Sequence, residues 1–345
     1  RDSPSLLMKM SRIKITVIPG DGIGPSIIES AIQILTHAGC DFEYEYADAG
    51  LVALEKHGEL LPQATLDLIE KNKVSLKGPL TTPVGGGFTS INVSLRKKFN
   101  LYANVRPVIS FKGTKSRYEN IDIITVRENT EGMYSGAGQK RSDDNKSAEA
   151  MSIITRDGAE RIVKFAFELA RQEGRKKVTI IHKANILKST SGLFLEVARE
   201  IAGHYPDIQS EEMIVDAACM NLVMYPERFD VMVTTNLFGD ILSDLCAGLV
   251  GGLGMAPGAN IGDGAAIFEA VHGSAPDIAG KNIANPTSVI LASIQMLEYL
   301  GMQDKAERIR EAVRATIESG DRVTRDLGGS ASTSEFTQQL CSKDT

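Results

Sequence analysis

Two aspartates, Asp240 and Asp244, lie four residues apart in TTNLFGDILSDLCAG (234–248), directly after an apolar stretch. On a helix, residues at this spacing share a face, where two carboxylates repel each other. Oxygen ligands of this kind suit a hard cation such as Mg²⁺ or Mn²⁺, and Asp216 is a third candidate ligand. The pattern also fits a solvated helix face, or an Asp240 in the first helical turn that interacts with the helix dipole.

Cationic and polar side chains accompany these acids. The segment 89–108 contains Ser90, Asn92, Arg96 and Arg106, and Arg127 follows. The planar guanidinium group matches a carboxylate in a bidentate fashion. Three arginines together with Ser and Asn therefore predict a site for a small polyanion such as a tricarboxylate, although any one of these arginines alone would be read as a surface residue.

Lys183 and Tyr134 are the candidates for proton transfer. A lysine among cations, or beside a divalent metal, has a lowered pKa and can exchange a proton at neutral pH. A tyrosine can deliver a proton to a developing carbanion. Without such a context, the two residues would be an ordinary surface lysine and a half-buried tyrosine.

Alternating strands and helices must position these groups. We expect strands at 121–126, 177–182 and 230–235, with helices between them, for example at 157–174. This alternation predicts an α/β fold with a largely parallel sheet. Polar residues follow each of these strands, and ligands of such sheets lie beyond the carboxyl ends of strands, so the side chains are expected to converge on one crevice.

Two loops are predicted outside this pattern. The run GDGIG (20–24) has the spacing GxGxG instead of GxGxxG, which favours a tight strand-to-helix turn over a dinucleotide phosphate loop. The polar stretch SGAGQKRSDDNKSAEA (135–150) is expected to form a loop or an arm outside the core.

The composition excludes several classes of protein. The 345 residues are 42% apolar and 24% charged with a net charge of −6, which disfavours a nucleic-acid partner. We expect no membrane association and no secretory signal. The first residues fit either an added segment or a processed end, and Met8 and Met10 are candidates for the native start. No pair among Cys40, Cys219, Cys246 and Cys341 has CxxC spacing, which predicts reduced thiols in a reducing compartment.

Seven motifs together resemble the metal-dependent β-decarboxylating dehydrogenases of isocitrate and isopropylmalate, most closely those that are NAD-dependent and act on isocitrate. They are IPGDGIGP, KGPLTTPVGGG, SINVSLR, VRENTEGMYSG, HKANILK, NLFGDILSD and GDGAAIFEAVHGSAPDIAGKNIANP. The resemblance covers residues 12 to about 330 and implies two α/β domains that share a large mixed sheet, with the active site in the cleft between them.

The resemblance implies a role for each candidate. Substrate carboxylates would be held by Ser90, Asn92, Arg96, Arg106 and Arg127. Tyr134 and Lys183 would be the proton-transfer pair. Asp240 and Asp244 would bind Mg²⁺ or Mn²⁺ with Asp216. The family's site is shared across a dimer, so Lys183 and Asp216 would serve the neighbouring subunit of a homodimer or higher homo-oligomer.

NAD is the implied cofactor. The Asp277-Ile278 pair resembles that of NAD-dependent members, whereas many NADP-dependent members have Lys-Tyr there. A carboxylate accepts hydrogen bonds from a ribose 2′-hydroxyl and repels a 2′-phosphate. The implied cofactor-binding residues are Thr82, Asn185, Glu269, His272, Gly273, Ala275, Asp277, Ile278 and Asn285.

The substrate implied is isocitrate, because Ser90 and Asn92 offer hydrogen bonds where isopropylmalate enzymes have a more apolar stretch. Homoisocitrate and 3-isopropylmalate remain alternatives, as does a non-catalytic regulatory subunit. The implied domains are 1–101 with 251–345, and 102–131 with 156–250, with an arm at 132–155. The expected location is the bacterial cytoplasm or the mitochondrial matrix.

Overall fold

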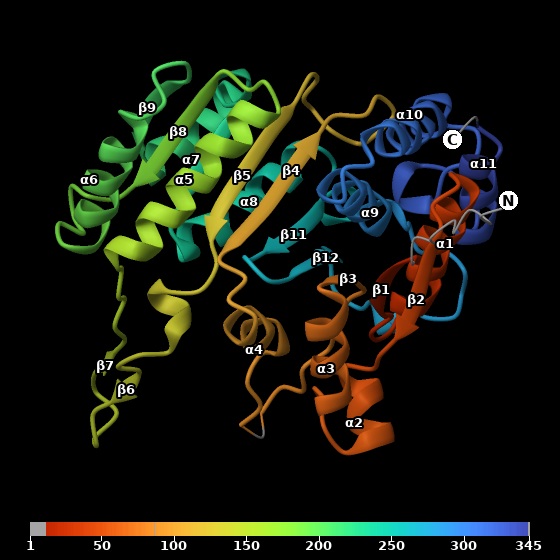
Figure 1. The fold of residues 1–345 in the computed structure, drawn as a ribbon, viewed down its shortest axis with the longest axis horizontal. Helices are drawn as coiled ribbons and strands as arrows, with labels where there is room; N and C mark the ends of the chain where they lie inside the picture. Colours follow the sequence, from red (N-terminus) through yellow and green to blue (C-terminus); the bar gives the residue numbers. More distant parts are fainter. Residues whose placement is uncertain (1–11, 86, 344–345) are drawn as a thin grey trace, which may run out of the picture.

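The computed structural model describes residues 12–85 and 87–343, and a single large sheet runs through it (Figure 1). Within these residues the sheet has ten strands in the order β2-β1-β3-β12-β11-β4-β5-β10-β8-β9. Its strands are β1 Ile13–Ile18, β2 Phe42–Tyr46, β3 Val74–Lys77, β4 Ala103–Ile109, β5 Asp122–Glu128, β8 Lys177–His182, β9 Gln209–Ile214, β10 Val231–Thr234, β11 Pro257–Ile261 and β12 Ala266–Ala270. The strands expected at 121–126, 177–182 and 230–235 are confirmed as β5, β8 and β10.

The sheet is mixed, because its centre is antiparallel. The strands β2, β1, β3 and β12 are parallel to one another, and so are β5, β10, β8 and β9. Between these blocks, β11 and β4 pair antiparallel with their neighbours. The expectation of a largely parallel sheet is confirmed, since six of the nine strand pairings are parallel. The antiparallel centre also confirms the mixed sheet that the resemblance implied. The chain enters β12 from β11, and β5 from β4, without a crossover helix, and parallel neighbours need such a crossover.

Helices cover both faces of the sheet. The α-helices are α1 Gly24–His37, α2 Leu51–His57, α3 Gln63–Asn72, α4 Ile91–Lys98, α5 Arg156–Gln172, α6 Thr190–Ala202, α7 Val215–Met224, α8 Asn236–Leu249, α9 Thr287–Tyr299, α10 Gln303–Ser319 and α11 Thr333–Cys341. Single turns are η1 Gly132–Ser135, η2 Pro226–Arg228, η3 Leu253–Met255, η4 Pro276–Ile278 and η5 Arg325–Leu327. The helix expected at 157–174 is confirmed as α5.

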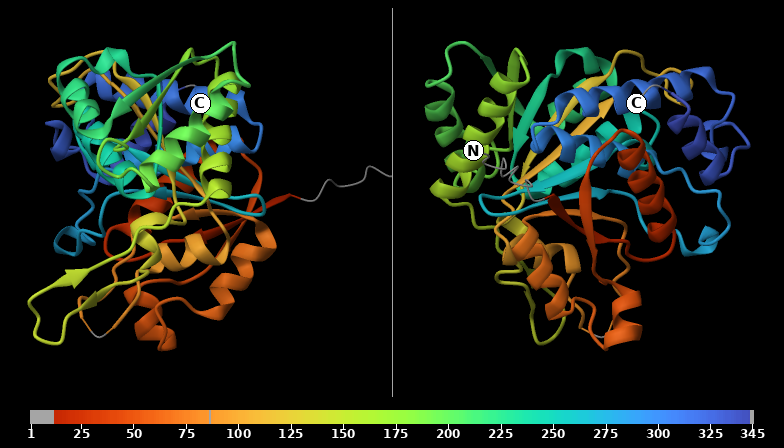
Figure 2. Two further views of the ribbon diagram at one scale, coloured as in Figure 1. Left: turned by 90° about the vertical axis from the view of Figure 1, so that its left-hand side faces the viewer. Right: turned by 45° about the vertical axis from the view of Figure 1, so that its right-hand side comes forward.

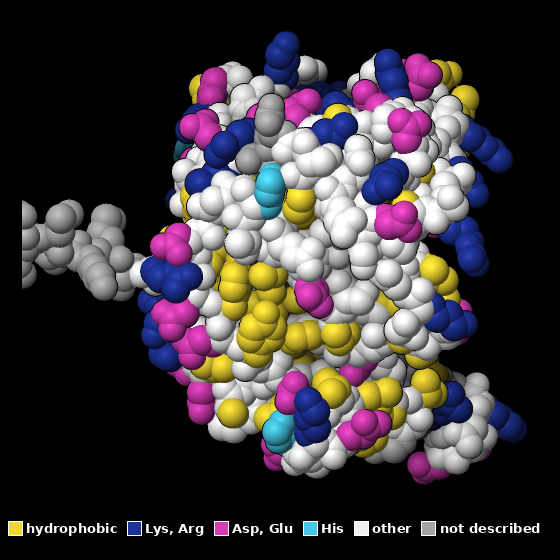
Figure 3. Space-filling view, turned by 90° about the vertical axis from the view of Figure 1, so that its right-hand side faces the viewer, with side chains coloured by type: hydrophobic (Ala, Val, Ile, Leu, Met, Phe, Trp, Pro, Cys, Tyr) yellow, Lys and Arg dark blue, Asp and Glu magenta, His cyan; other side chains and the backbone are white. Residues whose placement is uncertain are grey.

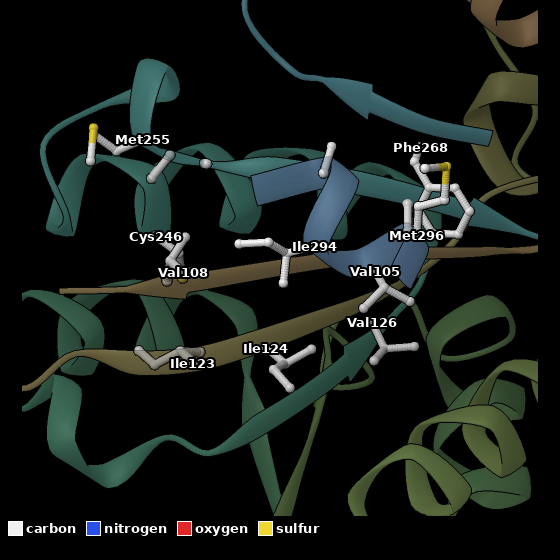
Figure 4. Packing of buried hydrophobic residues seen from close by; sticks show 14 of the residues in the cluster. Val105, Val108, Ile123, Ile124, Val126, Cys246, Met255, Phe268, Ile294 and Met296 are labelled. Carbon is white, nitrogen blue, oxygen red and sulfur yellow. The ribbon is translucent and has the colours of Figure 1, made fainter. Parts of the chain in front are cut away.

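One hydrophobic core extends along the whole sheet. Figure 4 shows part of it, where Phe268 of β12 lies beside Met296 of α9 and Val105 of β4 lies near Val126 of β5. A smaller cluster packs α3 and α4 against the ends of β1 and β12, and it includes Ile91. The two halves of the molecule therefore share a core, which keeps the central strands in a fixed register.

The outer edge of the sheet on one side is β2, which pairs with β1. Figure 3 shows a group of exposed hydrophobic side chains on the face of the molecule at this end of the sheet. On these two strands, Ile13 and Tyr46 are 43% and 60% exposed. Glu43 and Glu45 alternate with the aromatic residues of β2. Charged side chains on an edge strand oppose pairing with another sheet, so β2 is protected as an edge.

The glycine-rich turn after β1 is a tight strand-to-helix turn, as predicted. Gly22 has φ +57°, and a Cβ there would lie 2.0 Å from the carbonyl oxygen of Ser274. Asp21, in the same turn, is buried and accepts hydrogen bonds from the backbone N–H groups of Leu51, Val52 and Thr81 at 2.8–2.9 Å. The turn thus joins α2 to the loop after β3.

The segment predicted as an arm lies outside the core, where Figure 2 shows it projecting from the body. It contains a short hairpin of β6 Lys140–Arg141 and β7 Ala148–Glu149. At its base, the Gly132 N–H donates to the carbonyl of Ile153 at 3.1 Å, which closes the two ends of the arm together.

All four cysteines are free thiols, and Cys40 and Cys246 are buried. Burial raises the pKa of the Cys246 thiol to about 12, which keeps it protonated and unreactive at neutral pH. In the part of the chain that the structure describes, no helix combines the length and the apolar character that a membrane crossing needs.

We predict that Asp21→Asn destabilises the fold. The amide keeps one acceptor oxygen but turns an NH₂ group toward backbone donors, so the loss should be about 2 kcal/mol in the free energy of unfolding. Urea unfolding at fixed protein concentration measures it. The exposed Asp143→Asn, at the arm, is the matched control. Equal midpoints for the two variants would contradict the role given to Asp21.

Candidate active site

Two arginines on neighbouring strands point to the same face of the sheet. Residues 105, 107, 122 and 124 face α5 and α9, so the alternation of side chains along β4 and β5 directs Arg106 and Arg127 to the opposite face, toward α8. Both side chains are buried, at 6% and 2% exposure. The predicted convergence of these arginines is therefore present in the structure.

Helix α8 approaches these arginines closely at one glycine. A Cβ on Gly239 would lie 2.5 Å from Cγ of Arg127. The glycine lets the helix backbone pack against the arginine stem, and this brings the next residue, Asp240, to the guanidinium group. A glycine directly before Asp240 thus has a steric reason, because it lets the helix pack against Arg127. It also has a chemical reason, because Asp240 then reaches the guanidinium group.

Each aspartate of α8 pairs with one arginine. Oδ1 of Asp240 lies 3.1 Å from Nη1 of Arg127, and Oδ1 of Asp244 lies 3.4 Å from Nη2 of Arg106. Their side chains are 45% and 60% exposed, so each carboxylate also faces open space. The interpretation of Asp240 as a first-turn residue is wrong, because α8 begins at Asn236 and has no acid in its first turn.

Burial lowers the pKa of both arginines. For Arg127 the loss of hydration, followed by the nearby charge of Arg96, lowers the pKa to about 10, and Asp240 opposes the shift. For Arg106 burial also dominates, and Asp244 and then Glu269 oppose it. Both groups remain cations at neutral pH, and they carry positive charge into a place that water does not reach.

Tyr134 completes this group. It lies in η1, at the base of the arm, and its hydroxyl donates a hydrogen bond to Asp240. Its ring lies over the Arg127 guanidinium, 5.0 Å from the ring centroid to Cζ. Burial raises the pKa of Tyr134, and the hydrogen bond to Asp240 raises it further. The phenol is consequently protonated at neutral pH, the state in which it can act as an acid.

The three polar residues around α4 lie at the rim of this site. Ser90 is exposed and precedes the helix, while Asn92 and Arg96 line a small space with Lys77 and Glu269. The Oδ1 atom of Asn92 is buried and accepts no hydrogen bond from the described residues. A polar acceptor in this state is available to a ligand.

A buried ion pair that the sequence did not indicate lies beneath this rim. Nζ of Lys77, at the end of β3, is 3.0 Å from Oε2 of Glu269 on β12, and Asn260 donates to the other oxygen at 3.0 Å. Burial alone would raise the pKa of Glu269, but Lys77 and Arg96 outweigh it and lower the pKa. Glu269 was expected at the cofactor. Lys77 was not among the predicted site residues. The sign of it in the sequence is a lysine at the end of the four-residue strand VSLK.

Lys183 and Asp216 form a separate pair, away from Asp240. Nζ of Lys183, after β8, lies 2.7 Å from Oδ1 of Asp216 in the first turn of α7. This bond lowers the pKa of Asp216. Among residues 12–85 and 87–343, no three His, Cys, Asp or Glu side chains are grouped so that they could hold a metal ion. One chain therefore does not bring Asp216 to Asp240 and Asp244.

The outer face of α7 and α8, close to this pair, is apolar. Met220, Val223 and Met224 on α7 and Leu237 and Ile241 on α8 are each at least 40% exposed. Two neighbouring helices with such a face are typical of a surface that another protein chain covers.

The residues expected at the cofactor fall in two places. The loop after β12 carries His272, Gly273, Ala275, Asp277 and Ile278. This loop meets the loop that carries Thr82 through a hydrogen bond of 2.6 Å between the hydroxyls of Ser274 and Thr81. Asp277 is exposed.

Asn285 and Asn185 differ in their positions. The side chain of Asn285, at the end of the loop after β12, donates to Asp326 at 3.0 Å. Asn185 follows β8, on the other side of the sheet centre, and is exposed. A single chain does not bring Asn185 to the other cofactor candidates, and it lies beside Lys183 instead.

A groove of about 990 Å³ lies on the opposite face of the sheet between α5, α9 and α10. Apolar strand residues form its floor, and its arginines Arg175 and Arg310 are in ion pairs with acids. We place the candidate active site on the α8 side, because two buried arginines, Tyr134 and the candidate metal ligands Asp240 and Asp244 meet there.

Comparisons with known proteins identify the family of this chain. A family model described as isocitrate/isopropylmalate dehydrogenase matches residues 14–340. The chain therefore belongs to the isocitrate/isopropylmalate dehydrogenase family, whose members are decarboxylating dehydrogenases that typically use NAD or NADP and a divalent metal ion.

Its relatives carry two substrate names at similar identity. The chain is 50% identical over 330 residues to an isocitrate dehydrogenase [NAD] catalytic subunit, mitochondrial, of Arabidopsis thaliana, covering 95% of this chain and 88% of that one. It is 51% identical over 329 residues to a 3-isopropylmalate dehydrogenase of Archaeoglobus fulgidus, covering 95% and 98%. A crystal structure of isocitrate dehydrogenase from Methylococcus capsulatus matches with a TM-score of 0.91 and 55% identity, covering 95% of this chain and 98% of that one.

We predict that two helical glycines respond oppositely to alanine. Gly239→Ala places a Cβ against Arg127 and should destabilise the protein by about 1–3 kcal/mol. Gly192→Ala, in α6 with no atom within 4 Å of its Cβ, should stabilise it by about 0.5–1 kcal/mol through helix propensity. Chemical unfolding of both variants measures the difference, and equal effects would contradict the close packing at Gly239.

Proposed function

We propose that this protein oxidises isocitrate with NAD and releases 2-oxoglutarate and CO₂, with the help of Mg²⁺ or Mn²⁺. The observation that carries the proposal is the arrangement on α8. Two carboxylates, Asp240 and Asp244, lie beside two buried guanidinium groups, and the hydroxyl of Tyr134 reaches Asp240. Anion-binding, metal-binding and proton-donating groups thus meet at one place.

The residues present fit a divalent metal. Asp240 and Asp244 offer oxygen donors from successive turns of one helix, and both are about half exposed toward open space. Hard cations prefer such ligands. Asp240 and Asp244 would hold the ion together with Asp216 of a second copy. When bound, the ion supplies Lewis acidity at the substrate hydroxyl and at the carbonyl oxygen that replaces it.

The chain's own residues carry the remaining steps. Arg96, Arg106 and Arg127, with Ser90 and Asn92, bind and orient the substrate carboxylates. The amine of Lys183, from the second copy, removes the proton of the substrate hydroxyl as hydride passes to the nicotinamide. After loss of CO₂, the hydroxyl of Tyr134 protonates the enolate carbon. Burial and Asp240 keep that phenol protonated until it is needed.

The polar groups around α4 support isocitrate as the substrate. The guanidinium group of Arg96, the side-chain NH₂ of Asn92 and the hydroxyl of Ser90 can donate hydrogen bonds to an ionised carboxylate, and beside an isopropyl group these donors would have no partner. Overall identity does not separate the two substrates, because relatives of both names are about equally similar. Homoisocitrate, longer by one methylene, and 3-isopropylmalate remain the alternatives.

A regulatory, non-catalytic subunit is the alternative from another class. Such a subunit is expected to have lost groups that the reaction needs. This chain has Tyr134, Lys183, Asp216, Asp240 and Asp244. Their retention favours a catalytic role.

The exposed Asp277 supports NAD over NADP, since a carboxylate accepts hydrogen bonds from the ribose and repels a 2′-phosphate. The candidates of the loop after β12, with Thr82, Glu269 and Asn285, would bind NAD, and Asn185 would reach it from the second copy. The domain division at residues 101/102 and 250/251, with the arm at 132–155, is part of the same proposal.

A homodimer or higher homo-oligomer accounts for two observations at once. The exposed apolar face of α7 and α8 would be covered, and the Lys183–Asp216 pair would open toward the neighbour's site. Each active site would then contain residues of two chains.

We predict metal-dependent activity with isocitrate and NAD. Initial rates on isocitrate, homoisocitrate, 3-isopropylmalate and malate, each with NAD and with NADP, should give the highest kcat/KM for isocitrate with NAD. EDTA should abolish the activity, and Mn²⁺ should restore it, because two carboxylates alone do not lower the pKa of the hydroxyl.

Three outcomes of these assays would count against the proposal. A higher kcat/KM with 3-isopropylmalate or homoisocitrate would replace the substrate. A preference for NADP would refute the role of Asp277. Full activity in EDTA would remove the metal from the reaction.

We also predict complementation between two inactive variants. Tyr134→Phe and Lys183→Met should each be nearly inactive alone. If each site takes Tyr134 from one chain and Lys183 from the other, random mixed dimers regain about a quarter of the wild-type activity, because half of the dimers have one intact site. Co-refolding and assay measure the gain. No gain, with mixed dimers shown by mass spectrometry, would mean that each site uses one chain.

A further inference from the structure

The buried side-chain amide of Asn236 lies between Arg127 and the segment that leads to Tyr134. Asn236 is the first residue of α8 and is 1% exposed. Its Oδ1 atom accepts a hydrogen bond of 2.8 Å from Nε of Arg127. Its Nδ2 atom donates a hydrogen bond of 3.0 Å to the carbonyl oxygen of Glu131. Both ends of a single side chain are therefore used, toward two different elements.

On the side of the arginine, this bond fixes the plane of the guanidinium group. Nε of Arg127 is held by Asn236 and Nη1 by Asp240, and the Tyr134 ring covers one face. A guanidinium group is flat and its donors have fixed directions. With two donors held, the remaining N–H groups have one orientation, which is the condition for binding a carboxylate in a defined pose.

On the other side, the bond fixes the base of the arm. The side chain of Glu131 accepts from the backbone N–H of Thr155 at 3.1 Å and from its hydroxyl at 2.8 Å. The next residue, Gly132, is bonded to Ile153. Tyr134 follows in η1, three residues after Glu131. The position of its hydroxyl over Asp240 therefore depends on where the Glu131 carbonyl is held.

We propose that Asn236 is a positioning residue that couples substrate binding to proton delivery, by holding the Arg127 guanidinium and the Tyr134 segment in one geometry. This inference rests on the proposed function, because the expected changes in KM and kcat are those of isocitrate oxidation. The contacts themselves belong to the chain and can be tested without turnover.

Two substitutions separate the two bonds. Asn236→Ala removes both, so KM for isocitrate should rise and kcat should fall, and kcat/KM should drop by about 100-fold, as a displacement near 1 Å can cause. Asn236→Asp keeps an acceptor for Nε of Arg127 but loses the donor to Glu131. Its KM should stay near the wild-type value while its kcat falls by about 10-fold or more.

Asn221→Ala is the matched control. The side chain of Asn221 on α7 is also buried, accepts from Nη1 of Arg228 at 2.8 Å and donates to the carbonyl of Ala217 at 2.8 Å. It thus bridges an arginine and a backbone carbonyl as Asn236 does, away from the substrate arginines. Its loss should lower the melting temperature to a similar extent and leave KM and kcat within about two-fold of wild type.

A spectroscopic readout tests the geometry directly. The Nε–H of Arg127, assigned with Arg127→Lys, should give a slowly exchanging NMR signal in the wild-type protein. The signal should persist in Asn236→Asp and in Asn221→Ala and should be lost in Asn236→Ala.

The proposal is overturned by an unchanged Arg127 signal in Asn236→Ala, by kinetics of Asn236→Ala that match those of Asn221→Ala, or by equal KM values in the Ala and Asp variants. Absence of isocitrate turnover in the wild-type protein would refute the proposed function instead, and the NMR comparison would still decide the placement of Arg127.

Discussion

The pairing of two buried guanidinium groups with the carboxylates of one helix underlies the whole site. Burial makes the charged forms of Arg106 and Arg127 less favourable, which their lowered pKa values report. An unpaired charge in such a place is strongly destabilising. Asp240 and Asp244 offset this cost because α8 comes close enough at Gly239. The arginines in turn hold the two carboxylates in a region where they would otherwise repel each other.

The antiparallel centre of the sheet is what brings the two arginines together. Arg106 is opposite Thr125 in the β4–β5 register, so Arg127 is its diagonal neighbour on the same face. Diagonal neighbours in an antiparallel pair are within reach of long side chains. A parallel β4 and β5 would require a crossover helix between them and a different register. The change in strand direction thus has a direct role in bringing the two arginines to one face of the sheet.

Much of this arrangement could be predicted from the sequence, because it depends on local pattern. Apolar runs identified β5, β8 and β10, and the polar residues after them identified Arg127, Lys183 and Asp240. The spacing of Asp240 and Asp244 placed them on one face of a helix. The polar stretch from 135 to 150 indicated an arm.

The parts of the site that could not be predicted depend on contacts between segments that are far apart in the sequence. The sequence could not show that Asp240 and Asp244 pair with arginines, because 113 and 138 residues separate the partners. Lys77 was missed because a lysine that ends a short apolar strand also fits a solvated strand end. Asp216 and Lys183 follow strands like the other candidates, but their strands and helix place them at a different part of the surface.

The closure at the base of the arm has a consequence for how this region can vary. Gly132 bonds to Ile153, and Glu131 bonds to Thr155, so the chain leaves and re-enters the body at nearly the same point. The hairpin of β6 and β7 beyond η1 is therefore an insertion whose length is independent of the sheet. Natural variants can lengthen, shorten or recode it while Tyr134, at its base, keeps its place beside Asp240.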